Sequence, residues 1–449
     1  MKKKVYGIET PPIPRDDEFS RMPPDLWSQV DPKKCGFDSK GNYLSWDEFI
    51  TRPPHFKQNN QSAWYVLGIR RNLEVFPGLA VVDEQNEAGV IQYSPSSLMG
   101  KLHKIDRLST LKHLQLGESN RNNFLSASLV MEEAITSAQM EGAATTRPVA
   151  KEMLSTGRKP RDFSEEMILN NYQLMKFANN MVKEPLSVEL IQEFNRVATQ
   201  NVCENDHTAG MIRTTPIAVV DEMYGETIHT APEAKTALAL LMVMCSFANA
   251  EHEDASFIHP IVKAVMLHFM VGYIHPFADG NGRTARALFY WYMLKSGYTN
   301  FQYISISTLL KESKSRYARA FVKTEVDRFD ATHFIDFNLT IIIRSLEHFS
   351  TFLQNKIDDI QKTRLDLYKS PYFNEFKLPH ITIIQKALDD PGREFTVVAC
   401  QTEFNVSATA ARAYLDKLAK LELLLKHPLK GRMMGYFAPR DLRERLKLK

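Results

Sequence analysis

The chain has 449 residues with 44% hydrophobic and 24% charged side chains, fractions that are ordinary for a soluble globular protein. One compact core does not accommodate this length, so we expect two or three domains. The net charge of +3, from 56 Lys and Arg against 53 Asp and Glu, excludes a strongly basic nucleic-acid coat protein and an acidic disordered chain.

The cysteines and the apolar runs indicate a reducing compartment without a membrane span. Four cysteines, at positions 35, 203, 245 and 400, are too few for a disulfide scaffold and too far apart for a CxxC pair. No apolar segment of a signal peptide follows the basic start. The longest uncharged runs, Thr236–Ala250 and Ala264–Ala278, have 15 residues each and are too short to cross a bilayer. We therefore expect a cytoplasmic protein.

Residues 1–60 hold 8 of the 22 prolines, which excludes a long helix because proline lacks the amide donor and clashes with the preceding turn. This arm is expected to lie on the body or to be partly disordered. From about residue 60, apolar residues at spacings of three and four predict a mainly α body. Residues 214–232 interrupt it with two short β runs, a hairpin pattern. The expected helices are 122–141, 164–182, 187–200, 233–250, 260–273, 284–296, 306–325 and 331–355.

The C-terminal residues predict a winged helix-turn-helix. The pattern gives a helix over 380–390, a β run at Glu394–Val398, a short helix near 399–404, a longer helix capped by Ser407, and two β runs. Residues 407–449 carry 11 Lys and Arg against 4 Asp and Glu, a local charge of +7, whereas the rest of the chain carries 45 against 49, or −4. The near-neutral total therefore conceals a basic module, which suits an acidic partner.

The most specific chemistry lies in HPFADGNGRTAR, residues 275–286. Gly280 and Gly282 flank an asparagine, so the backbone can turn tightly and present its amides outward. A helix is expected to begin near Arg283, and its N-terminus carries partial positive charge. Arg283 and Arg286, at i and i+3, project from adjacent parts of that helix. Amides, helix N-terminus and arginines together predict a site for a polyanion.

Two other residues of this segment supply reactive groups. Phosphate would repel Asp279 unless a cation lay between them, and Mg²⁺ is the hard ion that shares carboxylate and phosphate oxygens. His275 follows the preceding helix, where an imidazole can serve as general base for an attacking hydroxyl. A GNG turn or two surface arginines alone are more often structural. Nine specified positions within twelve residues, however, make an accidental match very improbable.

The same segment matches the signature HPFx(D/E)GNGRxxR of the Fic family at every specified position, so residues 120–330 resemble a Fic domain. The resemblance implies a mainly α fold, with a helical core and a β-hairpin flap, that transfers AMP from ATP to a Ser, Thr or Tyr hydroxyl of a protein, including itself. His275 would deprotonate the hydroxyl, and Asp279 would hold Mg²⁺. The residues implied to bind ATP and its phosphates are Asp279, Gly280, Asn281, Gly282, Arg283, Arg286 and Tyr317.

Ser137-Ala138-Gln139-Met140-Glu141-Gly142 fits the (S/T)xxxE(G/N) inhibitory motif of the family. It lies N-terminal to the core, as in the class whose inhibitory helix belongs to the same chain. Ser137, Glu141 and Gly142 are the motif residues, and Glu141 is expected to pair with Arg286 and to take it away from the γ-phosphate. The alternative interpretation is that Glu141 and Gly142 only mark the C-terminal end of a helix.

The flap implied by the resemblance consists of Thr227, Ile228, His229 and Thr230, which would pair with a target peptide by β-addition. Ala231 stands where the family often has the first proline of a Pro-Pro pair, so the register stays open. Tyr317 is equally compatible with a place beside the adenine and with packing in the core. Two histidines of the helix before the motif, His259 and His268, are expected to be core or cap residues, not metal ligands.

The predicted domains are a proline-rich arm (1–60), a helical region with the inhibitory helix (61–160), the catalytic core (161–355) and the winged helix (370–449). Two alternative functions stay open. A DNA-binding regulator would place Arg412, Lys417 and Lys420 of the helix 407–422 in a major groove and Lys430 and Arg432 of the wing on phosphates, although winged helices also bind proteins. A Fic enzyme working in reverse would remove AMP. Members of the family often pair through the helical core, so a homodimer is a further expectation.

Overall fold

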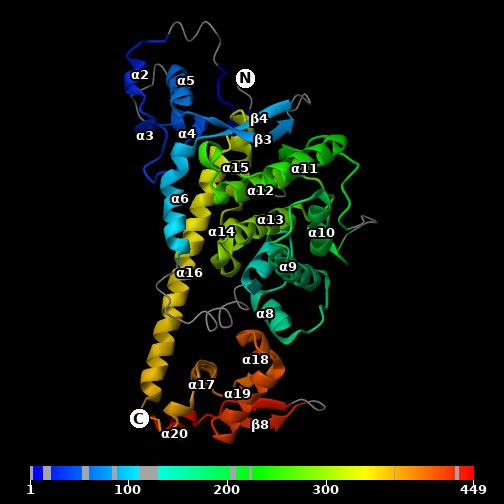
Figure 1. The fold of residues 1–449 in the computed structure, drawn as a ribbon, viewed down its shortest axis with the longest axis vertical. Helices are drawn as coiled ribbons and strands as arrows, with labels where there is room; N and C mark the ends of the chain where they lie inside the picture. Colours follow the sequence, from blue (N-terminus) through cyan, green and yellow to red (C-terminus); the bar gives the residue numbers. More distant parts are fainter. Residues whose placement is uncertain are drawn as a thin grey trace.

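The structure is a computed structural model built mostly from α-helices (Figure 1). It describes residues 4–13, 22–52, 60–82, 88–110, 130–202, 209–221, 225–368, 370–429 and 434–448. The mainly α fold class is therefore confirmed. Residues 122–129 of the predicted inhibitory helix, Cys203, and the wing residues Lys430 and Arg432 lie outside the described residues. Among the helices of the described ranges, none combines the length and the apolar character needed to cross a membrane.

The described part of residues 1–60 lacks a long helix, as its prolines predict, but it forms a packed unit of short elements and not an extended arm. They are β1 (Lys4–Val5), β2 (Ile8–Glu9), α2 (Leu26–Gln29), α3 (Pro32–Cys35), α4 (Trp46–Ile50) and α5 (Asn60–Arg70). The ring of Trp64 packs against Trp46 and Phe49, with centroids 5.6 and 5.4 Å away. Because Trp64 belongs to α5, the apolar core of this unit crosses the boundary predicted at residue 60.

A second hairpin follows in a region that was predicted to be helical. β3 (Glu74–Val82) pairs antiparallel with β4 (Ala88–Tyr93), and α6 (Pro95–Ser109) comes next. The helical prediction is wrong here because β3 is rich in valine, which favours strands, and because Pro77 and Gly78 (φ +73°) do not suit the interior of a helix. The hairpin packs against α11 (Ala234–Asn249).

The helical body surrounds α12. Residues 130–140 are helical, and every residue of α12 except Pro260 and Gly272 is buried. α13 packs against α12, α9 and α10, which places its N-terminus deep in the body. It begins at Asn281, slightly earlier than the predicted start near Arg283. The elements are α8 (Arg147–Thr156), α9 (Phe163–Asn180), α10 (Val188–Thr199), α12 (Pro260–Ile274) and α13 (Asn281–Lys295).

Two predicted helices have different limits in the structure. The segment 306–325 is two helices, α14 (Ile306–Glu312) and α15 (Lys314–Val326), which separate at Ser313. α16 (Thr332–Leu367) passes the boundary predicted at residue 355. In Figure 1 this long yellow helix runs from the body down to the C-terminal elements, and Leu367 joins their apolar core. The body and the C-terminal module therefore share a helix.

The hairpin predicted within 214–232 is present. β5 (Ala218–Val220) pairs antiparallel with β6 (Thr227–Thr230). Val219 lies opposite His229, and the register then shifts so that Val220 lies opposite Thr227. The shift is typical of a β-bulge, which increases the local twist of a hairpin.

The C-terminal residues contain the predicted elements in the predicted order. Ser407 caps α19, since its hydroxyl accepts a hydrogen bond from the amide of Ala410. β9 lies between β7 and β8 in a three-stranded antiparallel sheet. The assignment to a winged helix-turn-helix stays a prediction. The elements are α17 (Leu378–Asp389), β7 (Glu394–Phe395), α18 (Val397–Phe404), α19 (Ala408–Lys420), β8 (Leu425–Pro428), β9 (Met434–Phe437) and α20 (Leu442–Arg445).

The basic side chains of α19 differ in their surroundings. Arg412 and Lys420 are exposed. Lys417, in contrast, donates to the backbone carbonyl of Glu375 at 2.6 Å and lies 3.6 Å from its carboxylate. One of the three cations predicted to enter a DNA groove is therefore engaged within the module.

Candidate active site

His275 lies at the junction between α12 and the loop that leads into α13. Its left-handed backbone, with φ +47°, ends α12, and its amide still donates to the carbonyl of Val271 at 3.0 Å. Nδ1 lies 3.2 Å from the carbonyl of Gly272. That contact favours a proton on Nδ1 and leaves Nε2 as the basic nitrogen. Burial lowers the pKa of His275, and the nearby cations His229 and Arg213 act in the same direction.

The turn after His275 is fixed by the side chain of Asn281. Its Nδ2 donates to the carbonyl of Phe277 at 2.7 Å, and its Oδ1 accepts from the amide of Phe277 at 3.0 Å. Gly280 precedes α13 with φ +79°, and a Cβ there would lie 2.5 Å from Cγ2 of Thr199. Because the side-chain amide of Asn281 is bonded to the backbone of Phe277, it is not available to a ligand. An approaching anion therefore meets the backbone N–H groups at the start of α13.

Arg283 lies in the first turn of α13, where its side chain is buried and bonded to the loop that precedes the helix. It is 1% exposed, and it donates to Oδ2 of Asp279 at 2.8 Å and to the carbonyl of Ala198 at 2.7 Å. The side chain of Asp279 is 49% exposed, so its carboxylate keeps an open side. One open carboxylate suits Mg²⁺, which commonly takes one or two carboxylates from a protein and completes its shell with substrate phosphates and water.

Arg286, one turn further along α13, is held by the segment 130–142. Its Nε donates to the hydroxyl of Ser137 at 2.8 Å, and its Nη2 forms an ion pair with Oε1 of Glu141 at 2.9 Å. A Cβ at Gly282 would collide with that same carboxylate oxygen. Glu141 therefore lies against the N-terminal turn of α13, where an anion is expected. The segment ends at Gly142, which has φ +100°.

Asn195 of α10 supports the loop from behind and was not predicted. Its Nδ2 donates to the carbonyl of Asp279 at 2.8 Å and to the hydroxyl of Thr284 at 3.3 Å. Its Oδ1 accepts from the amide of Gly210 at 3.1 Å. Asn195 is 2% exposed. An amide on the apolar face of a helix is the sequence signal that can find such a residue, because a buried amide needs partners.

Arg213 joins the loop to the flap and was also missed. Its Nε donates to the carbonyl of His275 at 2.8 Å, and its other nitrogens donate to the carbonyls of Thr215, Pro232 and Ile274. It is 5% exposed, and burial lowers its pKa. A single guanidinium thus fixes both the base of the β5–β6 hairpin and the backbone of the histidine.

The predicted flap residues lie on β6. The ring of His229 is buried, with Nε2 2.7 Å from the carbonyl of Tyr273 and Nδ1 2.9 Å from Oε2 of Glu325. Burial alone would lower the pKa of His229, but Glu325 outweighs it and raises that pKa. Thr227 and Thr230 are exposed, and Ile228 is half-buried. His229 therefore anchors the strand while its neighbours stay accessible.

Tyr317 of α15 is half-buried and packs against the rings of Phe321 and Phe334. Packing in the core was one of the two places predicted for it. Its hydroxyl lies 2.8 Å from Nε2 of His268. Burial, with Arg286 nearby, lowers the pKa of His268 to about 3, so that ring is neutral. His259 accepts from the amide of Ile261 and caps α12. Both histidines of α12 thus have the structural places that were expected.

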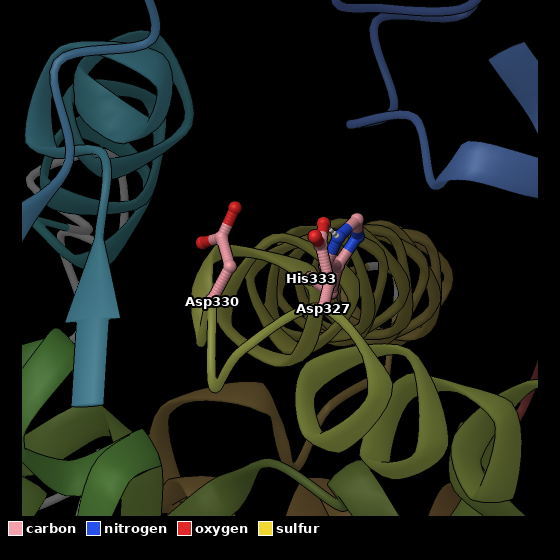
Figure 2. A group of neighbouring side chains, drawn as sticks. All are labelled: Asp327, Asp330 and His333. Carbon is pink, nitrogen blue, oxygen red and sulfur yellow. Dashed lines mark hydrogen bonds and ion pairs between the residues drawn. The ribbon is translucent and has the colours of Figure 1, made fainter. Parts of the chain in front are cut away.

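Asp327, Asp330 and His333 are the one group of acidic and histidine side chains in the described ranges whose atoms lie close enough to share a metal ion (Figure 2). Figure 2 shows Asp327 beside His333, with Asp330 to one side of them. Nε2 of His333 lies 3.0 Å from Asp327, and Asp330 accepts from the hydroxyl of Tyr43 at 2.8 Å. The bond from Tyr43 ties the N-terminal unit to the residues just before α16, which is a structural use of the group.

Residues 185–293, which contain the loop, α12 and most of α13, match the family described as Fic/DOC. The match starts before α10 and includes Asn195 and Arg213 as well as the motif. The segment 130–142, which is predicted to be inhibitory, lies outside the matched range.

Similar proteins carry the same domain. The chain is 31% identical over 150 residues to Protein adenylyltransferase fic-1 of Caenorhabditis briggsae, which covers 32% of this chain and 27% of that protein. It is 30% identical over 157 residues to Protein adenylyltransferase Fic of Drosophila virilis, which covers 34% and 30%. The chain thus spans less than a third of the length of these two curated relatives. Fic-1 from C. elegans, a solved structure, shares 18% identity with a TM-score of 0.48, over 69% of this chain and 82% of that chain.

Proposed function

We propose that this chain is a protein adenylyltransferase, which moves AMP from ATP to a Ser, Thr or Tyr hydroxyl of a protein and is inhibited by its own Glu141. The observation that carries the proposal is the loop 275–286. It brings a basic imidazole, the amides at the start of α13, two buried arginines and an open carboxylate together within twelve residues. The names of the similar proteins support the same reaction.

His275 is the general base of this proposal. Its Nε2 takes the proton of the target hydroxyl as the hydroxyl oxygen attacks the α-phosphorus of ATP. The bond between that phosphorus and the oxygen bridging to the β-phosphate breaks, so pyrophosphate leaves with the electron pair. Arg213 holds the backbone of His275 while the proton moves. The lowered pKa of His275 keeps the ring neutral, and therefore ready to accept the proton, at neutral pH.

The phosphates are held by the loop and by α13. The amides of residues 281 and 282 and the helix N-terminus would face the developing charge on the α-phosphate, whereas the amide of Gly280 donates to Asp279. Arg283 and Arg286 would orient the β- and γ-phosphates after exchanging their present partners. Asp279 would hold Mg²⁺, which neutralises phosphate charge when it is bound. The chain therefore contributes mostly position and fixed charge, which are the large terms in phosphoryl and nucleotidyl transfer.

Inhibition follows from the place of Glu141. While its carboxylate holds Arg286 and lies against Gly282, the arginine is directed toward residues 137–141 and away from a γ-phosphate. The carboxylate also adds negative charge beside the predicted phosphate site, which disfavours the reactive pose of ATP. Release of residues 130–142 would return Arg286 to the nucleotide.

The flap and Tyr317 complete the proposed substrate sites. The exposed edge of Thr227–Thr230 would accept an extended target peptide as an added strand. Tyr317 would contact the adenine with the part of its ring that stays accessible. Pairing of two copies through the core, a cytoplasmic location, and binding of DNA or a protein by the C-terminal module stay predictions. Removal of AMP by the reverse reaction stays an open alternative.

The decisive experiment uses ATP labelled on the α-phosphate, Mg²⁺ and three proteins: wild type, Glu141→Gly, and Glu141→Gly combined with His275→Ala. We expect auto-modification to rise at least about 10-fold in Glu141→Gly. It should fall to background when His275→Ala is added, because a general base commonly contributes about 10²–10⁴-fold to the rate. Mass spectrometry identifies the modified hydroxyl. AMP transfer that survives His275→Ala would contradict the assigned base, and an adenylylated product that loses AMP on incubation would favour the reverse reaction.

A further inference from the structure

The inhibitory segment has an apolar core of its own. Side chains of the helical residues 130–140 pack with α8 and α9 in a cluster distinct from the main core around α12. The cluster consists of Met131, Ile135, Ala138, Ala143, Ala150, Met153, Leu154, Met167, Ile168 and Val202. Because these side chains pack together, a shift of α8 is passed to the inhibitory helix, which is held to the main body by Glu133 through Ser305 and Ser307 and by Glu141 through Arg286.

Ion pairs strengthen the contact between this helix and α8. Glu132 pairs with both Arg147 and Lys151, one turn apart on α8. The side chain of Glu132 is 10% exposed, whereas those of Arg147 and Lys151 are 59% and 43% exposed. Loss of the two cations would leave a buried carboxylate without a charge partner, which favours separation of the helix from α8. Their removal disturbs little else, because both are surface residues.

The outer side of α8 contacts the C-terminal module. α18 packs against α8, and Figure 1 shows α18 directly below α8 at the junction of the two parts. The module is otherwise continuous with the body through α16, which packs on α17. It has a separate apolar core, so it can shift as a body. α8 is therefore the element that touches both the C-terminal module and the inhibitory helix.

We propose that the C-terminal module controls the inhibitory helix through α8. With α18 docked, α8 and the Glu132 ion pairs hold residues 130–142 in place, and Glu141 keeps Arg286. When a partner of the module draws α18 away, α8 loses its support and Glu141 is released. This inference rests on the proposed adenylyltransferase activity, and it gives the basic module a regulatory role in the same chain.

The first test removes the ion pairs in the full-length protein. Arg147→Gln with Lys151→Gln is expected to raise auto-modification by labelled ATP at least several-fold, toward the rate of Glu141→Gly. Lys104→Gln, which breaks an exposed pair with Glu347 on α16, is the matched control and leaves the rate unchanged. In the Glu141→Gly background the double variant adds nothing, because the contact that it releases is already gone.

Two outcomes separate this inference from the function on which it rests. An active Glu141→Gly with an unchanged rate in the Arg147/Lys151 variant overturns the coupling alone. An inactive Glu141→Gly removes the adenylyltransferase assignment and the coupling with it. Hydrogen exchange gives a readout that does not depend on activity: the amides of 130–142 should exchange faster in the double variant than in Lys104→Gln. Equal exchange in the two variants also overturns the coupling.

The second test weakens the helix α18, through which the C-terminal module contacts α8. The hydroxyl of Thr396 caps α18 by accepting from the amide of Ala399 at 3.1 Å, and the hydroxyl of Ser407 caps α19 by accepting from Ala410 at 3.2 Å. Thr396→Ala loosens the helix that contacts α8, and Ser407→Ala loosens a neighbour by a similar amount. We expect auto-modification and exchange of 130–142 to rise in Thr396→Ala only. Equal responses would refute the route through α18.

Discussion

The loop 275–286 and the inhibitory segment 130–142 both hold charged groups at the start of α13, but they are built in different ways. The loop is closed by its own bonds, from Asn281 to Phe277 and from Arg283 to Asp279. The inhibitory segment reaches Arg286 across a long stretch of chain, from a separate small core. The loop is thus closed by local bonds, whereas the segment 130–142 is held by bonds to residues far away in the chain, among them Ser305 and Arg286. That difference suits the proposal of a phosphate site that is always formed and an inhibitory segment that can be released.

The largest loss of AMP transfer is expected from Gly280→Ala, which forces the backbone of the loop to shift. Gly280 has φ +79°, and a Cβ would lie 2.5 Å from Thr199 and 2.8 Å from Asn195. The backbone must therefore shift at the position that sets the start of α13, so AMP transfer in the Glu141→Gly background should fall by at least about 100-fold. Rates with labelled ATP, together with a thermal melt, measure the loss.

Gly297→Ala is the control for that change. Gly297 has φ +87°, but a Cβ there meets no atom within 4 Å. It pays the left-handed backbone cost of about 1–2 kcal/mol without a clash. A similar loss of activity in both variants would mean that general destabilisation, and not the close approach at the loop, explains the result.

Arg213→Gln tests the next level, the connection between the loop and the flap. Arg213 donates to the carbonyls of His275 and Pro232, so its loss should let the base and the flap move independently. We expect kcat for a protein target to fall by about 10- to 100-fold, with a smaller change in the KM for ATP. Arg213→Lys keeps the charge but cannot reach several carbonyls at once, so it should restore little. Full rescue by lysine would show that charge alone matters.

Asn195→Ala should have a smaller effect on the rate and a clear effect on stability. The substitution leaves the carbonyl of Asp279 and the amide of Gly210 without their partner, which costs about 1–3 kcal/mol for each buried group left unsatisfied. Activity should fall about 10-fold beyond what unfolding explains. Asn338→Ala removes a buried amide bonded within α16 and serves as the control. The ratio of lost activity to lost melting temperature should be larger for Asn195→Ala than for Asn338→Ala. Equal ratios would mean that Asn195 does not position the loop.

These residues also show where sequence reasoning succeeds. The loop could be predicted because its chemistry is contiguous, and the C-terminal elements because their order follows apolar periodicity and caps such as Ser407. Asn195 and Arg213 were missed because a buried amide or guanidinium bonded to backbone carbonyls leaves no motif of its own. The β3–β4 hairpin was missed for another reason. The helical period was extended across Pro77 and Gly78, although neither continues a helix.

The smallest effect concerns pH and compares the two histidines beside the loop. Because burial lowers the pKa of His275, the base is lost to protonation only below the usual histidine range, so the acid limb of kcat/KM should fall below about pH 6.5. Glu141 raises the pKa of His275, so Glu141→Gly moves the limb lower still. His229 lowers that pKa, and His229→Gln should therefore move the limb up. A profile of kcat/KM against pH for the two variants measures both shifts. A limb above pH 6.5 in Glu141→Gly, or a downward shift with His229→Gln, would mean that another group titrates, because both known charge effects on His275 have the opposite sign.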